Sequence, residues 1–126
     1  MKTRITLMVL LFALFSVLSK ASQAEKQAQP ISDKVKAIID NKCFGCHNSD
    51  SKNDEAKDDL NFSTFDSLSK LQQIVAYKKI DDTVEANEMP PRKFLKHYPD
   101  KTLSTSEKEL LMQWAKKEAE ALVKGL

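Results

Sequence analysis

Hydrophobic residues recur with the period of an α-helix in three parts of the chain. The first part carries apolar residues three and four positions apart, namely Val35, Ile38 and Ile39. Residues at this spacing share one helix face. The spacing therefore predicts a helix that is capped by Ser32 or Asp33 and runs to about Lys42.

The second part has an apolar stripe made of Phe65, Leu68, Leu71, Ile74 and Val75. It predicts a helix from about residue 66 to 79 with this stripe facing the core. A shorter helical piece is expected over 81–86, with Val84 turned inward.

The third part lies near the C-terminus. Ser104 and Glu107 form a Ser-x-x-Glu capping box, which is a strong start signal for a helix. Gly125 gives a stop, so the last helix should run to about Lys124. Its buried side is expected to carry Leu110, Leu111, Trp114 and Leu122. Helical patterns dominate the chain, and they predict an all-α fold.

A polar stretch over 48–59 separates the first two apolar stripes. It contains no large apolar side chain. Such a segment buries too little surface to offset the entropy that ordering costs. We therefore expect a mobile polar loop over 48–59.

The N-terminus has the layout of a secretory signal peptide. Lys2 and Arg4 precede an apolar run over 5–18, and small residues follow at 21–24. We expect cleavage after Ala24, which leaves residues 25–126 as one mature domain. The apolar run is shorter than the roughly 20 residues that a spanning helix needs. The prediction is a periplasmic protein with no stable membrane insertion after cleavage, and the alternative is an N-terminal membrane anchor that stays uncleaved.

Removal of this leader changes the charge of the chain. The whole chain has 20 basic and 18 acidic residues, a net charge of +2. The leader contains three bases (Lys2, Arg4 and Lys20) and no acid, so 17 bases then face 18 acids and the net charge becomes −1. Bases and acids are interspersed along the mature chain, and we expect no nucleic-acid partner.

The run Cys43-Phe44-Gly45-Cys46-His47 is typical of c-type haem attachment. If the run is helical, its two thiols and its imidazole share one face. Two thioethers can then form with the porphyrin vinyl groups while His47 ligates the iron. Both cysteines of the chain lie in this run, and an oxidising compartment would join them unless haem attachment consumes the thiols.

The motif also has three uses other than haem attachment. A zinc site could combine Cys43, Cys46 and His47 with His97. A thioredoxin-like redox pair needs a βαβ context, which the sequence lacks. A disulfide between residues three apart would close a very small loop and gain little stability.

Met89 is the candidate for the second axial ligand. It precedes Pro90 and Pro91, which stiffen and extend the backbone. The alternative for Met89 is a core methionine that fills a gap, and the competing ligand is His97. Methionine with histidine raises the reduction potential, whereas two nitrogen ligands favour ferric iron.

With these motifs the chain resembles a small monohaem c-type cytochrome, and more closely the haem-binding-domain family. The likeness covers about residues 31–122 and rests on the Cys-x-x-Cys-His run, on Glu88-Met89-Pro90-Pro91, and on the ending Leu103-Ser104…Glu107…Trp114. It implies a class I-like cytochrome c fold, in which three to five helices surround one covalently attached haem c. It also implies that the terminal helices cross beside the haem, with His47 as proximal and Met89 as distal ligand.

Two features depart from the class I pattern. Val35 and Ile39 stand where that pattern has a glycine and an aromatic residue. No proline follows soon after His47, although its carbonyl usually orients the imidazole. The sequence therefore names no acceptor for the second nitrogen of His47.

The function expected from these residues is single-electron transfer in the periplasm. Larger redox proteins would be the partners, meeting the protein through small transient surfaces. We expect a carrier rather than an enzyme with its own substrate, and we assign no catalytic residue. The alternatives are a haem-based sensor of small ligands, a peroxidase-like enzyme with a labile distal site, and a bis-histidine carrier that uses His97.

Overall fold

The structure is a computed structural model and describes residues 31–126. The predicted signal peptide over 1–24 lies outside the described residues. Residues 31–126 form five α-helices and two 3₁₀-helices and contain no strand. The order is α2 (Asp33–Lys42), α3 (Asp54–Asp59), η2 (Phe65–Ser67), α4 (Lys70–Glu85), α5 (Arg92–Leu95), η3 (Pro99–Lys101) and α6 (Thr105–Lys124). The all-α prediction is confirmed, and no helix within 31–126 is long and apolar enough to cross a membrane.

Helix α2 begins and ends as its sequence predicts. The Ser32 side chain accepts a hydrogen bond from the Val35 backbone N–H, which otherwise has no partner in the first turn. Asp33 in the first turn and Lys42 in the last complement the helix dipole. The predicted stripe of Val35, Ile38 and Ile39 is buried.

Helix α4 is one continuous helix where two pieces were predicted. A capping box between Ser69 and Gln72 starts it at Lys70, a few residues later than expected. The predicted inward face is wrong at two positions, because Leu71 is 64% exposed and Val75 is 66% exposed. Helix α4 instead turns Ile80 and Val84 toward the core.

Helix α6 confirms the predicted capping box. The Glu107 backbone N–H donates to the Ser104 hydroxyl, and the Ser104 N–H donates to the Glu107 carboxylate at 2.8 Å. Gly125 caps the C-terminus of the helix. Leu111 is fully buried, whereas the other three residues of the predicted face, Leu110, Trp114 and Leu122, are partly buried.

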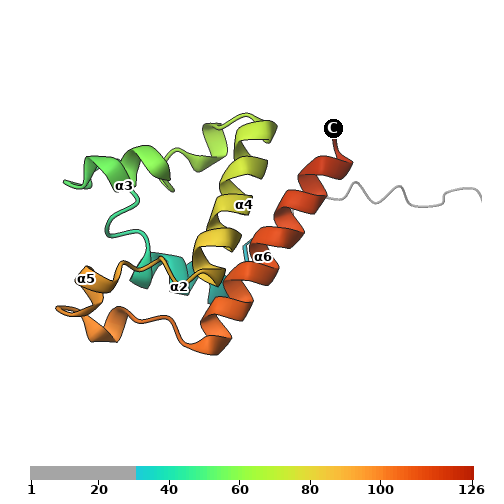
Figure 1. Ribbon diagram of the computed structural model, residues 1–126. Helices are drawn as coiled ribbons and strands as arrows, with labels where there is room; N and C mark the ends of the chain where they lie inside the picture. Colours follow the sequence, from blue (N-terminus) through green and yellow to red (C-terminus); the bar gives the residue numbers. More distant parts are fainter. Residues whose placement is uncertain (1–30) are drawn as a thin grey trace, which may run out of the picture. The chain divides into compact units, whose positions relative to one another are not determined.

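Helices α4 and α6 run antiparallel and pack side by side (Figure 1). Helix α2 also contacts α6, so the expected contact between the first and last helices of the domain is present. The end of α2 is tied to the start of α6 by an ion pair of 3.0 Å between Lys42 and Glu107. Three helices and Leu103, which lies two residues before α6, build one core. The buried members of this core are Val35, Ile38, Ile39, Ile80, Val84, Leu103, Leu111 and Ala115.

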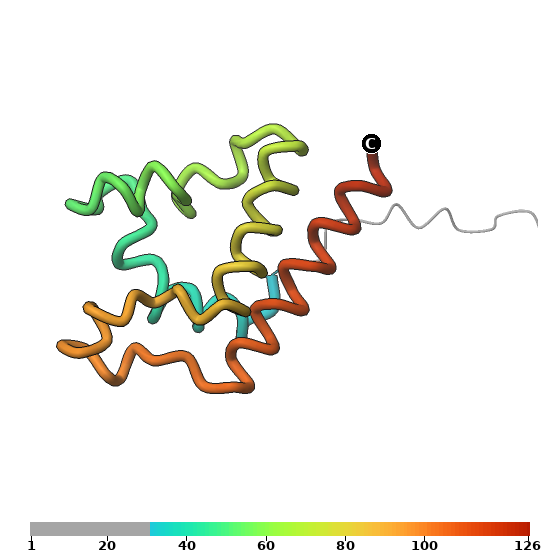
Figure 2. Tube along the Cα trace, in the orientation of Figure 1, coloured from blue at the N-terminus to red at the C-terminus, as the bar shows by residue number. Residues whose placement is uncertain are grey.

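The prediction of a structureless loop is wrong for residues 54–59, which form helix α3. The Asn53 side chain caps the helix by accepting from the Ala56 N–H. Lys57 pairs with Asp54 one turn away. Helix α3 buries no residue, so capping and polar contacts, rather than apolar burial, hold it in place. The tube in Figure 2 shows this segment looping away from the α4–α6 pair before the chain returns to α4.

Candidate functional site

The Cys-x-x-Cys-His run forms a tight turn at the C-terminal end of α2. The backbone N–H groups of Cys46 and His47 both donate to the Cys43 carbonyl, each at 3.1 Å. The bond from His47 to Cys43 has helical spacing, although α2 itself ends at Lys42. One turn of the backbone therefore brings the two thiols and the imidazole close together.

Both thiols are free. Burial, together with the charge of the neighbouring Cys46, raises the pKa of the Cys43 thiol to about 11. The thiolate is the reactive form of cysteine. Cys43 is therefore held as a neutral thiol at neutral pH.

His47 is buried, and its ring is fixed by backbone carbonyls. Its Nδ1 lies 2.8 Å from the carbonyl oxygen of Ala56 and 3.0 Å from that of Leu60. Carbonyl oxygens only accept, so Nδ1 carries the proton and donates it. The lone pair is then on Nε2, the atom left to ligate a metal. Helix α3 thus supplies the acceptor that the sequence left unnamed.

Aromatic rings extend from His47 to α6 through a series of neighbours. Phe62 lies edge-on to His47 with ring centroids 6.5 Å apart, and its backbone N–H donates to the His47 carbonyl at 3.0 Å. Phe65, Tyr77 and Trp114 continue the series with centroid spacings of 6.2, 5.0 and 5.2 Å. Burial, aided by Glu118 and Asp66, raises the pKa of Tyr77 to about 12. Tyr77 therefore stays uncharged at neutral pH, and the four rings from Phe62 to Trp114 bring no charge into this part of the protein.

Met89 lies four residues after the end of α4. Asn87 has a φ of 57°, a left-handed conformation that Asn adopts more readily than most residues. The Asn87 N–H donates to the Val84 carbonyl and the Glu88 N–H donates to the Thr83 carbonyl. These two bonds make a Schellman motif, which ends the helix sharply. The backbone therefore turns away from the axis of α4 just before Met89.

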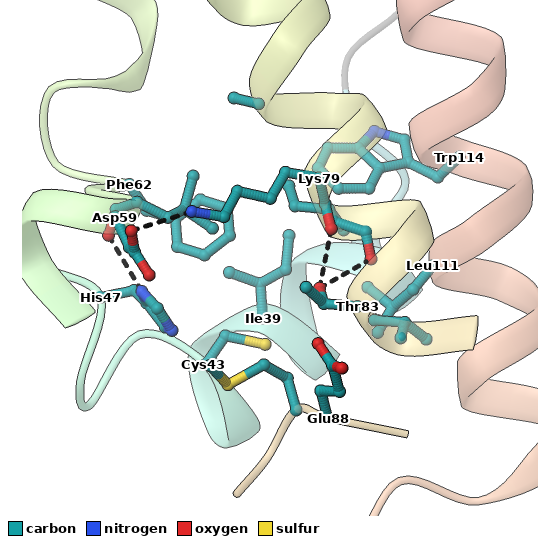
Figure 3. A pocket seen from close by; sticks show the side chains of 15 residues that line it. Ile39, Cys43, His47, Asp59, Phe62, Lys79, Thr83, Glu88, Leu111 and Trp114 are labelled. Carbon is teal, nitrogen blue, oxygen red and sulfur yellow. Dashed lines mark hydrogen bonds and ion pairs between the residues drawn. The ribbon is translucent and has the colours of Figure 1, made fainter. Parts of the chain in front are cut away.

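A cavity of about 210 Å³ brings these residues together (Figure 3). Cys43, His47 and Met89 line it. Most of the remaining wall is apolar and comes from Ile39, Leu60, Phe62, Ile80, Val84 and Leu111. Two further hollows, of about 250 and 50 Å³, share His47 and Met89 with the cavity and add Cys46. The four residues predicted to hold haem therefore line adjoining hollows.

His97 does not join this group. It is exposed, and it is not among the described residues that line the three hollows. Residues 31–126 also hold no cluster of three or more His, Cys, Asp or Glu side chains suited to a metal ion. The zinc alternative, which needs His97 beside the motif, has no support in this arrangement.

A comparison with protein families shows which family the chain belongs to. The model of the haem-binding domain matches residues 50–117, which is more than half of the chain. The chain belongs to the haem-binding domain family. A search of curated proteins found no match, and neither did a search of solved structures. The matched range contains Met89 and begins after His47, so the match and the Cys-x-x-Cys-His motif are independent pointers to haem.

The residues of this haem-binding domain fit the cofactor. A buried imidazole with a free Nε2, a thioether sulfur and two free thiols line hollows with largely apolar walls. Imidazole and thioether are axial ligands of cytochrome iron, and thiols are the groups that link haem c covalently. Nitrogen and sulfur donors of this kind suit iron better than magnesium or calcium, which prefer oxygen.

Sequence reasoning missed the groups that surround these donors. The carbonyls of Ala56 and Leu60 orient His47, yet every residue has a carbonyl and no sequence signal marks one as an acceptor. An ion pair of 2.8 Å between Asp59 and Lys79 also lies at the cavity. Hydrogen bonding and charge from Lys79 hold the pKa of Asp59 below its usual value. No sequence signal marks these two residues as a pair, because they lie 20 residues apart in the chain.

Proposed function

We propose that this haem-binding domain is a monohaem c-type cytochrome that carries single electrons. Cys43 and Cys46 would form the thioether links, His47 would be the proximal ligand and Met89 the distal ligand. The observation that carries the proposal is that all four side chains line adjoining hollows. The fixed tautomer of His47 supports its role, because a ligating histidine almost always donates its other ring N–H to a partner.

Electron transfer is favoured over catalysis by the proposed ligand set. Bound haem supplies one-electron chemistry by alternating between ferric and ferrous iron. His47 and Met89 would hold both axial positions, so no coordination site would remain for a substrate. A peroxidase-like reaction would need a distal acid–base group, and the exposed His97 lies outside the three hollows.

The compartment and the partners belong to the same proposal. The leader over 1–24 would direct export and be removed, which places haem attachment in the periplasm. Larger redox proteins would then donate and accept the electron through transient contacts. Small contact areas suit such encounters because the partners must separate after each transfer.

The proposal is tested by optical spectra of the full chain exported in cells that attach haem c. We expect colour that stays with the polypeptide after denaturation, and that is lost in the double variant Cys43→Ala/Cys46→Ala. We also expect a weak far-red band in the oxidised protein, which marks sulfur ligation from methionine. Met89→Ala should abolish this band, and the matched variant His97→Ala should leave it unchanged.

Other outcomes would overturn the ligand assignment. If His97→Ala changes the spectrum and Met89→Ala does not, a bis-histidine carrier replaces the proposal. A high-spin spectrum that ignores both substitutions would mean open iron, and the sensor and peroxidase-like alternatives would then lead. Carbon monoxide binding to the reduced protein separates these two from the carrier.

Localisation is tested by fractionating the same cells. The haem protein should appear in the periplasmic fraction with a mature N-terminus at Glu25, as read by mass spectrometry of the intact chain. Recovery in the membrane fraction with residues 1–24 attached would replace cleavage with the anchor alternative.

A further inference from the structure

The ion pair between Asp59 and Lys79 joins two elements across the cavity. Asp59 is the last residue of α3, and Lys79 lies in the middle of α4. The Lys79 Nζ lies 2.8 Å from the Asp59 Oδ1, and both side chains are about half exposed. Both residues line the cavity of about 210 Å³ that also contains Cys43, His47 and Met89. Figure 3 shows the long side chain of Lys79 reaching over the cavity to Asp59.

Few charged side chains line this cavity, and Lys79 is one of them. The charged side chains that line it, apart from the imidazole, are Asp59, Lys79 and Glu88. Lys79 is thus the one lysine or arginine among the described residues of the lining. Its neighbour Lys78 pairs with Asp82 at 3.0 Å on the outer surface of α4 and does not line the cavity.

Haem carries two propionate side chains, each of which ends in a carboxylate. The propionates lie on the edge of the porphyrin opposite its two vinyl groups. Attachment of the vinyl groups to Cys43 and Cys46 therefore fixes the direction in which the propionates point. Figure 3 shows the ammonium group of Lys79 beside Asp59 and apart from Cys43. A carboxylate near an apolar wall needs a charged or hydrogen-bonding partner, since an unpaired ion there is costly.

We propose that Lys79 binds a propionate carboxylate of the haem while it keeps its contact with Asp59. The proposal rests on the proposed function, because haem attachment at Cys43 and Cys46 sets the direction of the propionate edge. A lysine ammonium has three N–H donors, so it can serve two carboxylates at once. Asp59 is therefore a positioning residue, which holds the ammonium at the cavity.

This arrangement couples the propionate edge to the proximal ligand. Asp59 is followed by Leu60, whose carbonyl accepts from His47 Nδ1 at 3.0 Å.

The positive charge of Lys79 near the haem disfavours ferric iron relative to ferrous iron. Its removal should therefore lower the reduction potential.

The experiment uses the full-length exported holoprotein and compares Lys79→Gln, Lys79→Arg and Lys78→Gln with wild type. Resonance Raman spectra report the propionate bending band, which shifts when a hydrogen bond to the carboxylate is lost. We expect Lys79→Gln to shift this band and to lower the reduction potential. Lys79→Arg should keep both near wild type, and the matched surface variant Lys78→Gln should change neither.

The proposal is overturned if the bending band of Lys79→Gln equals that of wild type. It is also overturned if Lys78→Gln and Lys79→Gln shift the band equally, because charge alone would then explain the effect. These results are distinguishable from failure of the proposed function. If the haem is covalently bound and Met89→Ala removes the far-red band, the cytochrome proposal stands while the role of Lys79 falls.

Discussion

The Nδ1 of His47 lies 2.8 Å from the carbonyl oxygen of Ala56, nine residues further along the chain. This contact connects the Cys-x-x-Cys-His motif to α3, a helix that buries none of its own residues. Helix α3 and His47 depend on each other. The helix fixes the tautomer of the imidazole, and the imidazole holds a polar segment that buries too little apolar surface to stay ordered without such contacts.

The cap of α3 should therefore matter for stability. Asn53→Ala removes the acceptor for the Ala56 N–H, and we expect the free energy of unfolding to fall by about 1 kcal/mol. Asn53→Asp keeps the acceptor and adds a favourable charge at the helix N-terminus, so it should stay close to wild type. Urea unfolding of the three proteins measures the difference. Equal stability of Asn53→Ala and wild type would show that α3 does not depend on this cap.

The left-handed residue at the end of α4 gives a second prediction. Asn87→Ala and Asn87→Gly both remove the hydrogen bond from Lys108 to the Asn87 side chain. They differ in the cost of a positive φ, which is about 1–2 kcal/mol for a residue with a Cβ. We expect Asn87→Gly to be the more stable of the two by about 1 kcal/mol in thermal or urea unfolding. No difference would mean that the Schellman motif does not hold the chain before Met89.

Substitution of two leucines tests which helix faces form the core. Leu111 on α6 is 1% exposed, whereas Leu71 on α4 is 64% exposed. Leu111→Ala should lower the free energy of unfolding by about 2–5 kcal/mol, because it leaves a cavity in the core. Leu71→Ala should change it by about 0.5 kcal/mol or less. A large loss in Leu71→Ala would restore the face that the sequence predicted.

The contacts of Glu107 predict a dependence of stability on pH. Its pKa lies below the ordinary value of 4.5 because the Ser104 backbone N–H donates to the carboxylate and Lys42 adds a hydrogen bond and charge. The Glu107 carboxyl therefore binds a proton more tightly in the unfolded chain than in the folded chain. As a result, the free energy of unfolding falls as the pH drops below the ordinary pKa of 4.5. The contribution should be complete at neutral pH.

Urea unfolding at a series of pH values between about 6 and 3 measures this effect. We expect Glu107→Gln to have a smaller acid-induced loss than wild type, since it carries no carboxyl to protonate. Glu109→Gln removes an exposed carboxylate from the same turn and should follow the wild-type curve. An identical acid profile for wild type and Glu107→Gln would refute the role of this carboxylate.

Part of this molecule was determined by the sequence alone. Helix ends depend on neighbours in the chain, so Ser32 at the start of α2, the Ser104–Glu107 box and Gly125 could all be predicted. The Cys-x-x-Cys-His run is likewise local, because one turn suffices to bring its three side chains together. These features need no knowledge of what packs against them.

Other features were decided only by the tertiary structure. Two apolar stripes on α4 have helical spacing, and packing against α6 chose the one with Ile80 and Val84 over the one with Leu71 and Val75. The order of α3 comes from a cap and from its contacts with His47, which composition does not reveal. The pairing of Asp59 with Lys79 needs two helices to approach each other. Periodicity specifies which residues share a helix face, but the partner that covers a face is set by contacts distant in the chain, and so are the polar groups that meet at the cavity.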